Sequence, residues 1–267
     1  MTGFSADWLT LREPFDRHAR NAHVLDAVAA VVSHQPAITV VDLACGTGST
    51  LRAVSPRLAP RQTWKLFDND LSLLARAAAS PHPAGATITA TPVDLAHDLE
   101  AALDGSVDLV TTSALLDLVS EAWLERLVIE TAARRLPLYA ALTFDGRISF
   151  EPAVPFDDEI VAAVNAHQRG DKGFGPALGP DAAATATRRF AALGYELITG
   201  PADWEFAPGD QAMQTETLRG WALAAQDFTR RAQEPIAAWL ARRLKLVKNG
   251  TSSIRVGHLD FLARPSR

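Results

Sequence analysis

The chain has 267 residues, of which 48% are apolar and only 7% aromatic, so Ala, Leu and Val must fill most of a large core. Its formal net charge of −5 disfavours a nucleic-acid partner, which would need clustered Lys and Arg to neutralise phosphates. The single cysteine, Cys45, excludes an internal disulfide and a multi-cysteine metal site.

The sequence gives little indication of a membrane or polyanion partner. The first residues lack a charged segment followed by an apolar one, and no apolar run approaches the ~18 residues of a membrane span. We therefore expect a cytoplasmic protein. The one basic cluster, Arg242, Arg243, Lys245 and Lys248, is interpreted as a solvated helix face.

The first half of the chain alternates between helical and strand patterns. A helix is predicted from Pro14, as a first-turn proline, to Val32. The β-branched run 38–43 then leads into a glycine turn at residues 44–48 and a helix from Ser49. Further strands are predicted at 63–67, 87–93, 107–112 and 138–144, with helices at 71–79, 99–103 and 121–135. This alternation predicts a parallel sheet whose ligands bind beyond the carboxyl ends of the strands.

The second half is less regular. Asp145-Gly146 predicts a β-hairpin, and a helix at 157–167 precedes a glycine-rich and proline-rich loop at 169–179, which is either a lid or an ordinary connector. Asp181 is expected to cap a helix that reaches Leu193, with Gly194 as its C′ residue, before a strand at 195–199. Helices at 218–228 and 236–246, with Trp221, Phe228 and Trp239 mainly in the core, precede a last strand at 253–262.

These elements predict one continuous domain with additions. Residues 1–35 would form an N-terminal helical cover. Residues 36–267 would form the main domain, with cap insertions at about 147–180 and 201–250.

One run of residues indicates a family. Residues 40–48, Val-Val-Asp-Leu-Ala-Cys-Gly-Thr-Gly, resemble motif I of the class I S-adenosylmethionine (AdoMet)-dependent methyltransferases, with Ala44 in place of the usual first glycine. Residues 66–70, 93–95 and 107–117 resemble the ends of the family's second, third and fourth strands. The resemblance spans about residues 36–145 and implies an α/β fold: a Rossmann-like, doubly wound, mostly parallel seven-stranded sheet with helices on both faces, plus helical decorations.

The resemblance also implies roles for the acids at the strand ends. Asp68 would accept the ribose hydroxyls of AdoMet and Asp94 its adenine amine, as carboxylates can. Asp42 would lie near the cofactor's ammonium group or simply anchor the turn, and Arg12 or Arg20 would meet its carboxylate. Asp68 has an alternative role as a helix cap, which Asn69 or Asp70 can also fill. The predicted cofactor-binding residues are Arg12, Asp42, Ala44, Cys45, Gly46, Thr47, Gly48, Asp68, Asn69, Asp94, Leu95 and Ser113.

The catalytic residues are less defined. Direct displacement on a sulfonium requires orientation more than acid–base chemistry, and a base is needed only if the acceptor must lose a proton. His167, Asp117 and Tyr139 are the candidates, and His167 serves equally well as a solvated helix cap. The seven histidines show no metal-ligand spacing, so no metal is expected. The net charge favours a small-molecule acceptor, while its identity and the oligomeric state stay open.

Two other classes of protein remain as alternatives. A nicotinamide-dependent oxidoreductase also has a glycine turn and an acid after its second strand, but its G-x-G-x-x-G motif requires a glycine where Leu51 stands. A non-catalytic binding module could also retain the methyltransferase fold, because a fold does not prove turnover.

Overall fold

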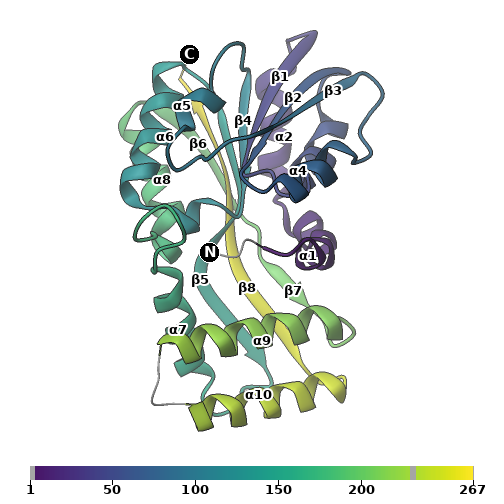
Figure 1. The fold of residues 1–267 in the computed structure, drawn as a ribbon, viewed down its shortest axis with the longest axis vertical. Helices are drawn as coiled ribbons and strands as arrows, with labels where there is room; N and C mark the ends of the chain where they lie inside the picture. The colour runs from purple at the N-terminus through teal and green to yellow at the C-terminus, as the bar shows by residue number, and fades with distance from the viewer. Residues whose placement is uncertain (1–3, 229–232, 267) are drawn as a thin grey trace.

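The computed structural model describes residues 4–228 and 233–266 and has a mixed α/β sheet at its centre (Figure 1). Seven strands follow the order β3-β2-β1-β4-β5-β8-β6, and a short eighth strand, β7, pairs with β8. In the described part of the chain, β8 runs opposite to the other strands of this order and all remaining pairs are parallel, so the predicted mostly parallel seven-stranded sheet is confirmed. The strands are β1 (Ala37–Leu43), β2 (Arg61–Asp68), β3 (Ala86–Pro92), β4 (Leu109–Ser113), β5 (Leu138–Glu151), β6 (Tyr195–Pro201), β7 (Trp204–Phe206) and β8 (Ser253–Pro265).

Helices cover both faces of this sheet, because its central strands carry apolar residues on both faces. Val41 and Leu43 of β1 pack in a core with α6 and α8, whereas Ile38 and Val40 face a second core with α2, α3 and α4. The helices of this layer are α2 (Ala22–Val32), α3 (Ser49–Val54), α4 (Leu71–Ala78), α5 (Leu99–Ala102), α6 (Glu121–Ala133) and α8 (Ala182–Ala192), with short 3₁₀ turns η1 (Ser55–Arg57), η2 (Leu116–Leu118) and η3 (Gly179–Asp181).

The predicted N-terminal helix is wrong in its bounds. α1 (Ala6–Ala19) begins well before Pro14, which therefore lies inside the helix. The helix is interrupted at Arg20, and a second helix, α2, follows. The break is set by Asn21, whose side chain caps α2 by accepting from the backbone of Val24 at 3.2 Å. The break turns α1 away from the sheet to pack against α3 and β7 (Figure 1).

The predicted hairpin at Asp145-Gly146 is also wrong. β5 continues through this dipeptide to Glu151 and pairs with β8 on both sides of a register shift between Phe144 and Ile148. Gly146 adopts φ +88°, so this glycine marks a β-bulge rather than a chain reversal. As a result, β5 and β8 extend far below the main sheet layer (Figure 1).

Three helices pack on this extension: α7 (Asp157–Gln168), α9 (Gln211–Phe228) and α10 (Gln233–Lys248), called the helical cap below. Trp221 and Trp239 lie edge-on to Phe150 there. The prediction that Phe228 lies in the core is wrong, because its side chain is 58% exposed. The solvated-face interpretation is wrong for Arg243, which is fully buried and donates to Asp157.

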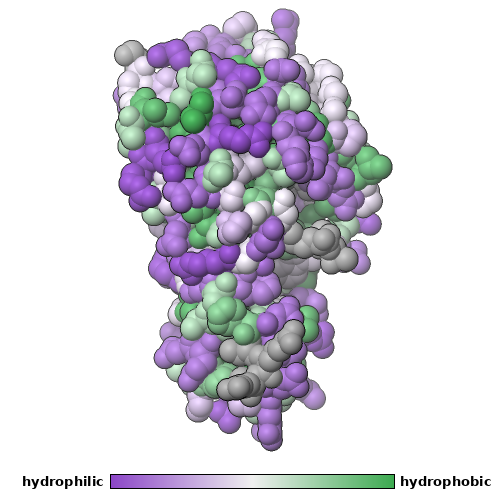
Figure 2. Space-filling model, turned by 60° about the vertical axis from the view of Figure 1, so that its left-hand side comes forward, coloured by the Kyte–Doolittle hydropathy of each residue, from purple (hydrophilic) through white to green (hydrophobic). Residues whose placement is uncertain are grey.

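A smaller correction concerns the start of α8. Asp181 makes no side-chain cap bond, because its carboxylate accepts from Arg169 at 2.9 Å instead. The face of the molecule seen in Figure 2 is mainly hydrophilic with scattered apolar side chains, and it narrows toward the helical cap. None of the helices in the described ranges is long and apolar enough to cross a membrane.

Candidate functional site

The glycine turn after β1 has an unusual backbone. Ala44, Gly46 and Gly48 all have positive φ, at +53°, +54° and +82°, and the turn is held to β2 by a 2.9 Å hydrogen bond from Cys45 N to Phe67 O. Glycine adopts this conformation freely, whereas at Ala44 it costs about 1–2 kcal/mol. Strain of this kind is typical of a functional turn.

Asp68, at the end of β2, braces this turn. One of its carboxylate oxygens accepts from Gly46 N at 2.8 Å and the other from Asp70 N at 3.0 Å. Helix capping falls to Asp70, which accepts from Ser72 N and Leu73 N at the start of α4. Asp68 therefore does not act as the cap, and it lies at the edge of the sheet against the glycine turn.

Asp42 lies directly before the turn and is fully buried. Its Oδ1 accepts from Thr111 Oγ1 at 2.8 Å, while its Oδ2 has no hydrogen-bond partner within the described part of the chain. Burial raises the pKa of Asp42 to about 7, although Thr111 and Arg20 favour the charged form. A buried carboxylate with an unpaired oxygen is a strong acceptor for a cationic or donor group.

Helix α1 closes over the turn. Together they enclose a cavity of about 40 Å³, which is room for little more than a water molecule. Its lining residues are Leu9, Arg12 and Asp16 from α1, and Ala44, Cys45, Gly46, Thr47, Ser49, Thr50 and Ser113 from the sheet side. Arg12 is buried and donates from Nε to Asp16 at 2.9 Å.

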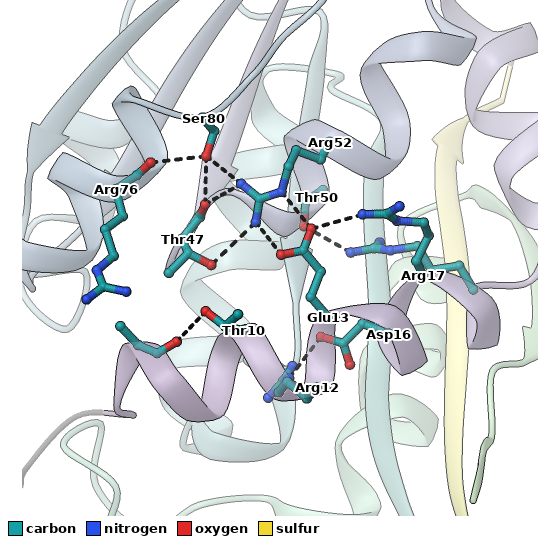
Figure 3. A network of polar contacts seen from close by, with 12 residues as sticks. Thr10, Arg12, Glu13, Asp16, Arg17, Thr47, Thr50, Arg52, Arg76 and Ser80 are labelled. Carbon is teal, nitrogen blue, oxygen red and sulfur yellow. Dashed lines mark hydrogen bonds and ion pairs between the residues drawn. The ribbon is translucent and has the colours of Figure 1, made fainter. Parts of the chain in front are cut away.

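A polar network ties α1 to the turn (Figure 3). The Glu13 carboxylate accepts from Nε and Nη2 of Arg52, both at 2.6 Å, and from Arg17 at 3.3 Å. Arg52 in turn donates to the backbone oxygen of Thr47 at 2.6 Å. This network was not predicted, because the i,i+4 spacing of Glu13 and Arg17 is its one local signal in the sequence.

Arg20 lies beneath the same turn. It is buried and donates to Tyr139 Oη and Thr50 Oγ1, both at 3.2 Å, and to Ser113 Oγ at 3.3 Å. Tyr139 is fully buried, donates to Asp260 at 2.9 Å, and has its pKa raised by burial. Tyr139 thus positions Arg20 and stays protonated, which is unsuitable for a base.

The remaining predicted adenine-side residues lie at the rim. Asn69 is exposed, and Asp94, also exposed, accepts from Ala96 N at 3.0 Å. Leu95 is buried, and its carbonyl accepts from Trp123 Nε1 at 2.6 Å. Asp94 therefore stands at the end of β3 with its carboxylate accessible.

Asp117 lies on η2, just after β4, and is 4% exposed. Its Oδ2 accepts from Gln168 Nε2 at 3.3 Å, while its Oδ1 has no partner among the described residues. Burial raises the pKa of Asp117 to about 6, although Arg12 and Lys172 act against that rise. The charges of α1 and of the 169–179 loop thus both act on this carboxylate.

His167 and Cys45 are less suited to chemistry. Burial and the neighbouring Lys172, 3.3 Å from Nδ1, lower the pKa of His167, which keeps the ring neutral. Burial raises the pKa of the Cys45 thiol, so it is unreactive. Across the described ranges, no group of three or more His, Cys, Asp or Glu side chains is arranged to hold a metal ion.

The sheet order, the left-handed turn after β1 and the acid at the end of β2 define the class I methyltransferase fold. Residues 40–137 match a family model described as a methyltransferase domain, so this part of the chain carries a methyltransferase domain. This match disfavours the oxidoreductase alternative. No curated protein matches the chain in a sequence search.

Solved structures share the fold at low sequence identity. A cyclopropane-fatty-acyl-phospholipid synthase-like protein from Lactobacillus casei is 12% identical, with a TM-score of 0.56 over 98% of this chain and 94% of that one. The YcgJ protein from Bacillus subtilis is also 12% identical, with a TM-score of 0.51 over 92% of this chain and all of that one. At this identity the similarity supports the fold alone.

Proposed function

We propose that this protein transfers a methyl group from AdoMet to an oxygen, nitrogen or carbon atom of a small molecule by direct displacement. The observation that carries the proposal is the convergence of Asp42, Asp68 and the left-handed glycine turn at the carboxyl ends of neighbouring strands. The methyltransferase domain implies AdoMet use, and these residues suit that cofactor chemically.

The proposed cofactor contacts follow from the acceptors and donors available. Asp68 would accept the ribose hydroxyls, and the turn residues 44–48 would approach the methionine portion closely. The unpaired Oδ2 of Asp42 would favour the cofactor's ammonium group, directly or through water. Arg12 and Ser113 would meet its carboxylate, and Asp94, Asn69 and Leu95 would surround the adenine.

Bound AdoMet supplies a methyl group on a positively charged sulfur, so the displacement requires neither a metal nor a covalent intermediate. The chain's own task is to orient the acceptor, which in well-aligned systems lowers the barrier by roughly 7–11 kcal/mol. If the acceptor must lose a proton, Asp117 is the proposed base. Its raised pKa of about 6 keeps it ionised at neutral pH but more basic than an ordinary carboxylate.

The test is calorimetric binding of S-adenosylhomocysteine to the wild type, Asp68→Asn and Asp98→Asn. Asp98 is an exposed acid whose side chain makes no cap bond, so it is a matched control. We expect binding in the wild type and control and roughly ten- to hundredfold weaker binding in Asp68→Asn, because a charge-assisted hydrogen bond is lost.

Two results would change the proposal. Binding of NADH but not of S-adenosylhomocysteine would overturn it. Binding of S-adenosylhomocysteine without transfer of labelled methyl to any small-molecule fraction would favour a non-catalytic module.

A further inference from the structure

A second and larger cleft lies beside α3, the helix that follows the glycine turn. Its volume is about 610 Å³, and it opens between the end of α1, Leu25 of α2, the α3–η1 segment and the loop 81–83 after α4. It shares no lining residue with the small cavity under α1. Small-molecule sites typically have volumes of about 300–1,000 Å³, so the cleft is large enough for one.

Positive charge gathers in this cleft. Within the described ranges its lining includes Arg17, Arg20, Arg52 and Arg57, and the carboxylates paired with them are Glu13 and Asp26. Arg20 is balanced from the core side by the buried carboxylates of Asp16, Asp42 and Asp260. The remaining three guanidinium groups, of Arg17, Arg52 and Arg57, are paired with only two carboxylates, and this local excess of positive charge favours an anion.

Two of these arginines keep most of their donors free. Arg17 donates to Glu13 from one nitrogen and is 64% exposed, and Arg57 donates to Asp26 from one nitrogen and is 42% exposed. A guanidinium carries five N–H donors in a planar fork. Arg17 of α1 and Arg57 of η1 therefore offer two planar sets of donors from two different elements that line the cleft.

The other two arginines build the site. Arg52 is committed to Glu13, Thr47 and Ser80, so it orders the wall between α1 and α3 (Figure 3). Arg20 is 5% exposed, and its Nε has no hydrogen-bond partner among the described residues. A buried donor without a partner is costly, which indicates that the base of this cleft suits an acceptor.

We propose that this cleft binds a small molecule bearing one or more phosphate groups. Phosphate oxygens match the planar fork of arginine in two parallel charge-assisted hydrogen bonds, and arginines from two elements fit an anion with more than one acceptor edge. This inference does not depend on the proposed methyl transfer.

The experiment measures binding of inorganic pyrophosphate by calorimetry in metal-free buffer at constant ionic strength. The wild type is compared with the double variant Arg17→Gln/Arg57→Gln and with Arg219→Gln, an exposed arginine on α9 paired with Glu216. We expect pyrophosphate to bind the wild type and Arg219→Gln. The affinity of the double variant for pyrophosphate should be lower by a factor of roughly ten or more.

Retention of the wild-type unfolding temperature by the double variant would show that weaker binding is not caused by misfolding. The proposal is overturned if the wild type does not bind pyrophosphate at millimolar concentration, or if the double variant binds it as tightly. It is also overturned if saturating S-adenosylhomocysteine abolishes pyrophosphate binding by direct competition, because the anion would then occupy the cavity under α1.

Discussion

At the scale of single residues, the buried carboxylate of Asp42 should make folding stability depend on pH. Its pKa rises from 3.8 to about 7 on folding, so the native state holds the proton more tightly than the unfolded chain. This residue's contribution is therefore most favourable below about pH 4 and is lost as the pH rises toward about pH 7. The total loss is about 4 kcal/mol, at 1.36 kcal/mol per pKa unit.

Asp42→Asn removes this titration while keeping the shape of the side chain. We expect the variant to gain stability relative to the wild type as the pH is raised from about 5 to about 8, measured as the difference in thermal midpoint. Asp98→Asn, at an exposed position, is measured alongside as the control. A constant difference for Asp42→Asn across this range would contradict the prediction.

Asp117 is the residue whose removal should affect turnover more than cofactor binding. Once an acceptor that loses a proton is found, Asp117→Asn should lower kcat about 10²–10⁴-fold. The wild-type rate should rise with pH through about 6 as the carboxylate ionises. His167→Gln is the discriminating control. A comparable loss of kcat in His167→Gln, together with an unchanged kcat in Asp117→Asn, would assign the base to His167.

The sequence predicted those site residues that act through neighbours close along the chain. The glycine turn and the acids at the carboxyl ends of β1, β2 and β3 follow from local strand patterns. The hydrogen bond that leaves one oxygen of Asp42 unpaired comes from Thr111, which lies 69 residues away along the chain. The one that leaves an oxygen of Asp117 unpaired comes from Gln168, which lies 51 residues away. Such contacts have no local signature, so their consequences for pKa become visible only in the fold.

At the scale of secondary structure, α1 covers the proposed cofactor site. The cavity beneath it measures about 40 Å³, far below the roughly 300–1,000 Å³ of a typical ligand site. We therefore expect α1 to shift outward before a nucleoside enters. The Glu13–Arg52 pair resists this movement, because both side chains are mostly buried and the contact is bidentate.

Glu13→Gln should weaken that restraint. We expect faster association of S-adenosylhomocysteine in stopped-flow measurements and faster amide exchange along α1. The thermal midpoint should fall by a few degrees, since roughly 1–3 kcal/mol is lost. Glu216→Gln, which breaks an exposed pair on α9, serves as the control. Unchanged association and exchange rates in Glu13→Gln would show that α1 does not limit entry.

Elements with a regular period were predictable, and those decided by one contact were not. The β-branched runs gave the sheet because burial on both faces requires them. The break between α1 and α2 depends on the single cap at Asn21, and the continuation of β5 depends on pairing with β8, more than 100 residues later. A dipeptide such as Asp145-Gly146 fits both a turn and a bulge, and only the partner strand decides between them.

At the scale of the whole molecule, the helical cap is joined to the sheet through the long β5 and β8 strands (Figure 1). Arg243 of α10 connects its parts: its Nε donates to Asp157 of α7 at 3.0 Å, its Nη1 donates to Pro152 O at 2.9 Å, and its guanidinium lies 4.2 Å from the ring centre of Phe150. Such an ion pair does not have to add net stability while intact, but removing one partner leaves a buried charge unpaired.

Arg243→Ala should therefore destabilise the protein by about 3–5 kcal/mol, which lowers the thermal midpoint by roughly 10 °C in a chain of this size. Arg242→Ala is a close control, because the neighbouring arginine is exposed and its removal should change the midpoint little. If the cap and the sheet unfold as one unit, both near-ultraviolet and far-ultraviolet circular dichroism will show the same lowered midpoint. Two separated transitions would instead mean that the helical cap, with the extensions of β5 and β8, unfolds independently of the sheet. A thermal midpoint of Arg243→Ala equal to that of Arg242→Ala would show that Arg243 does not contribute to stability.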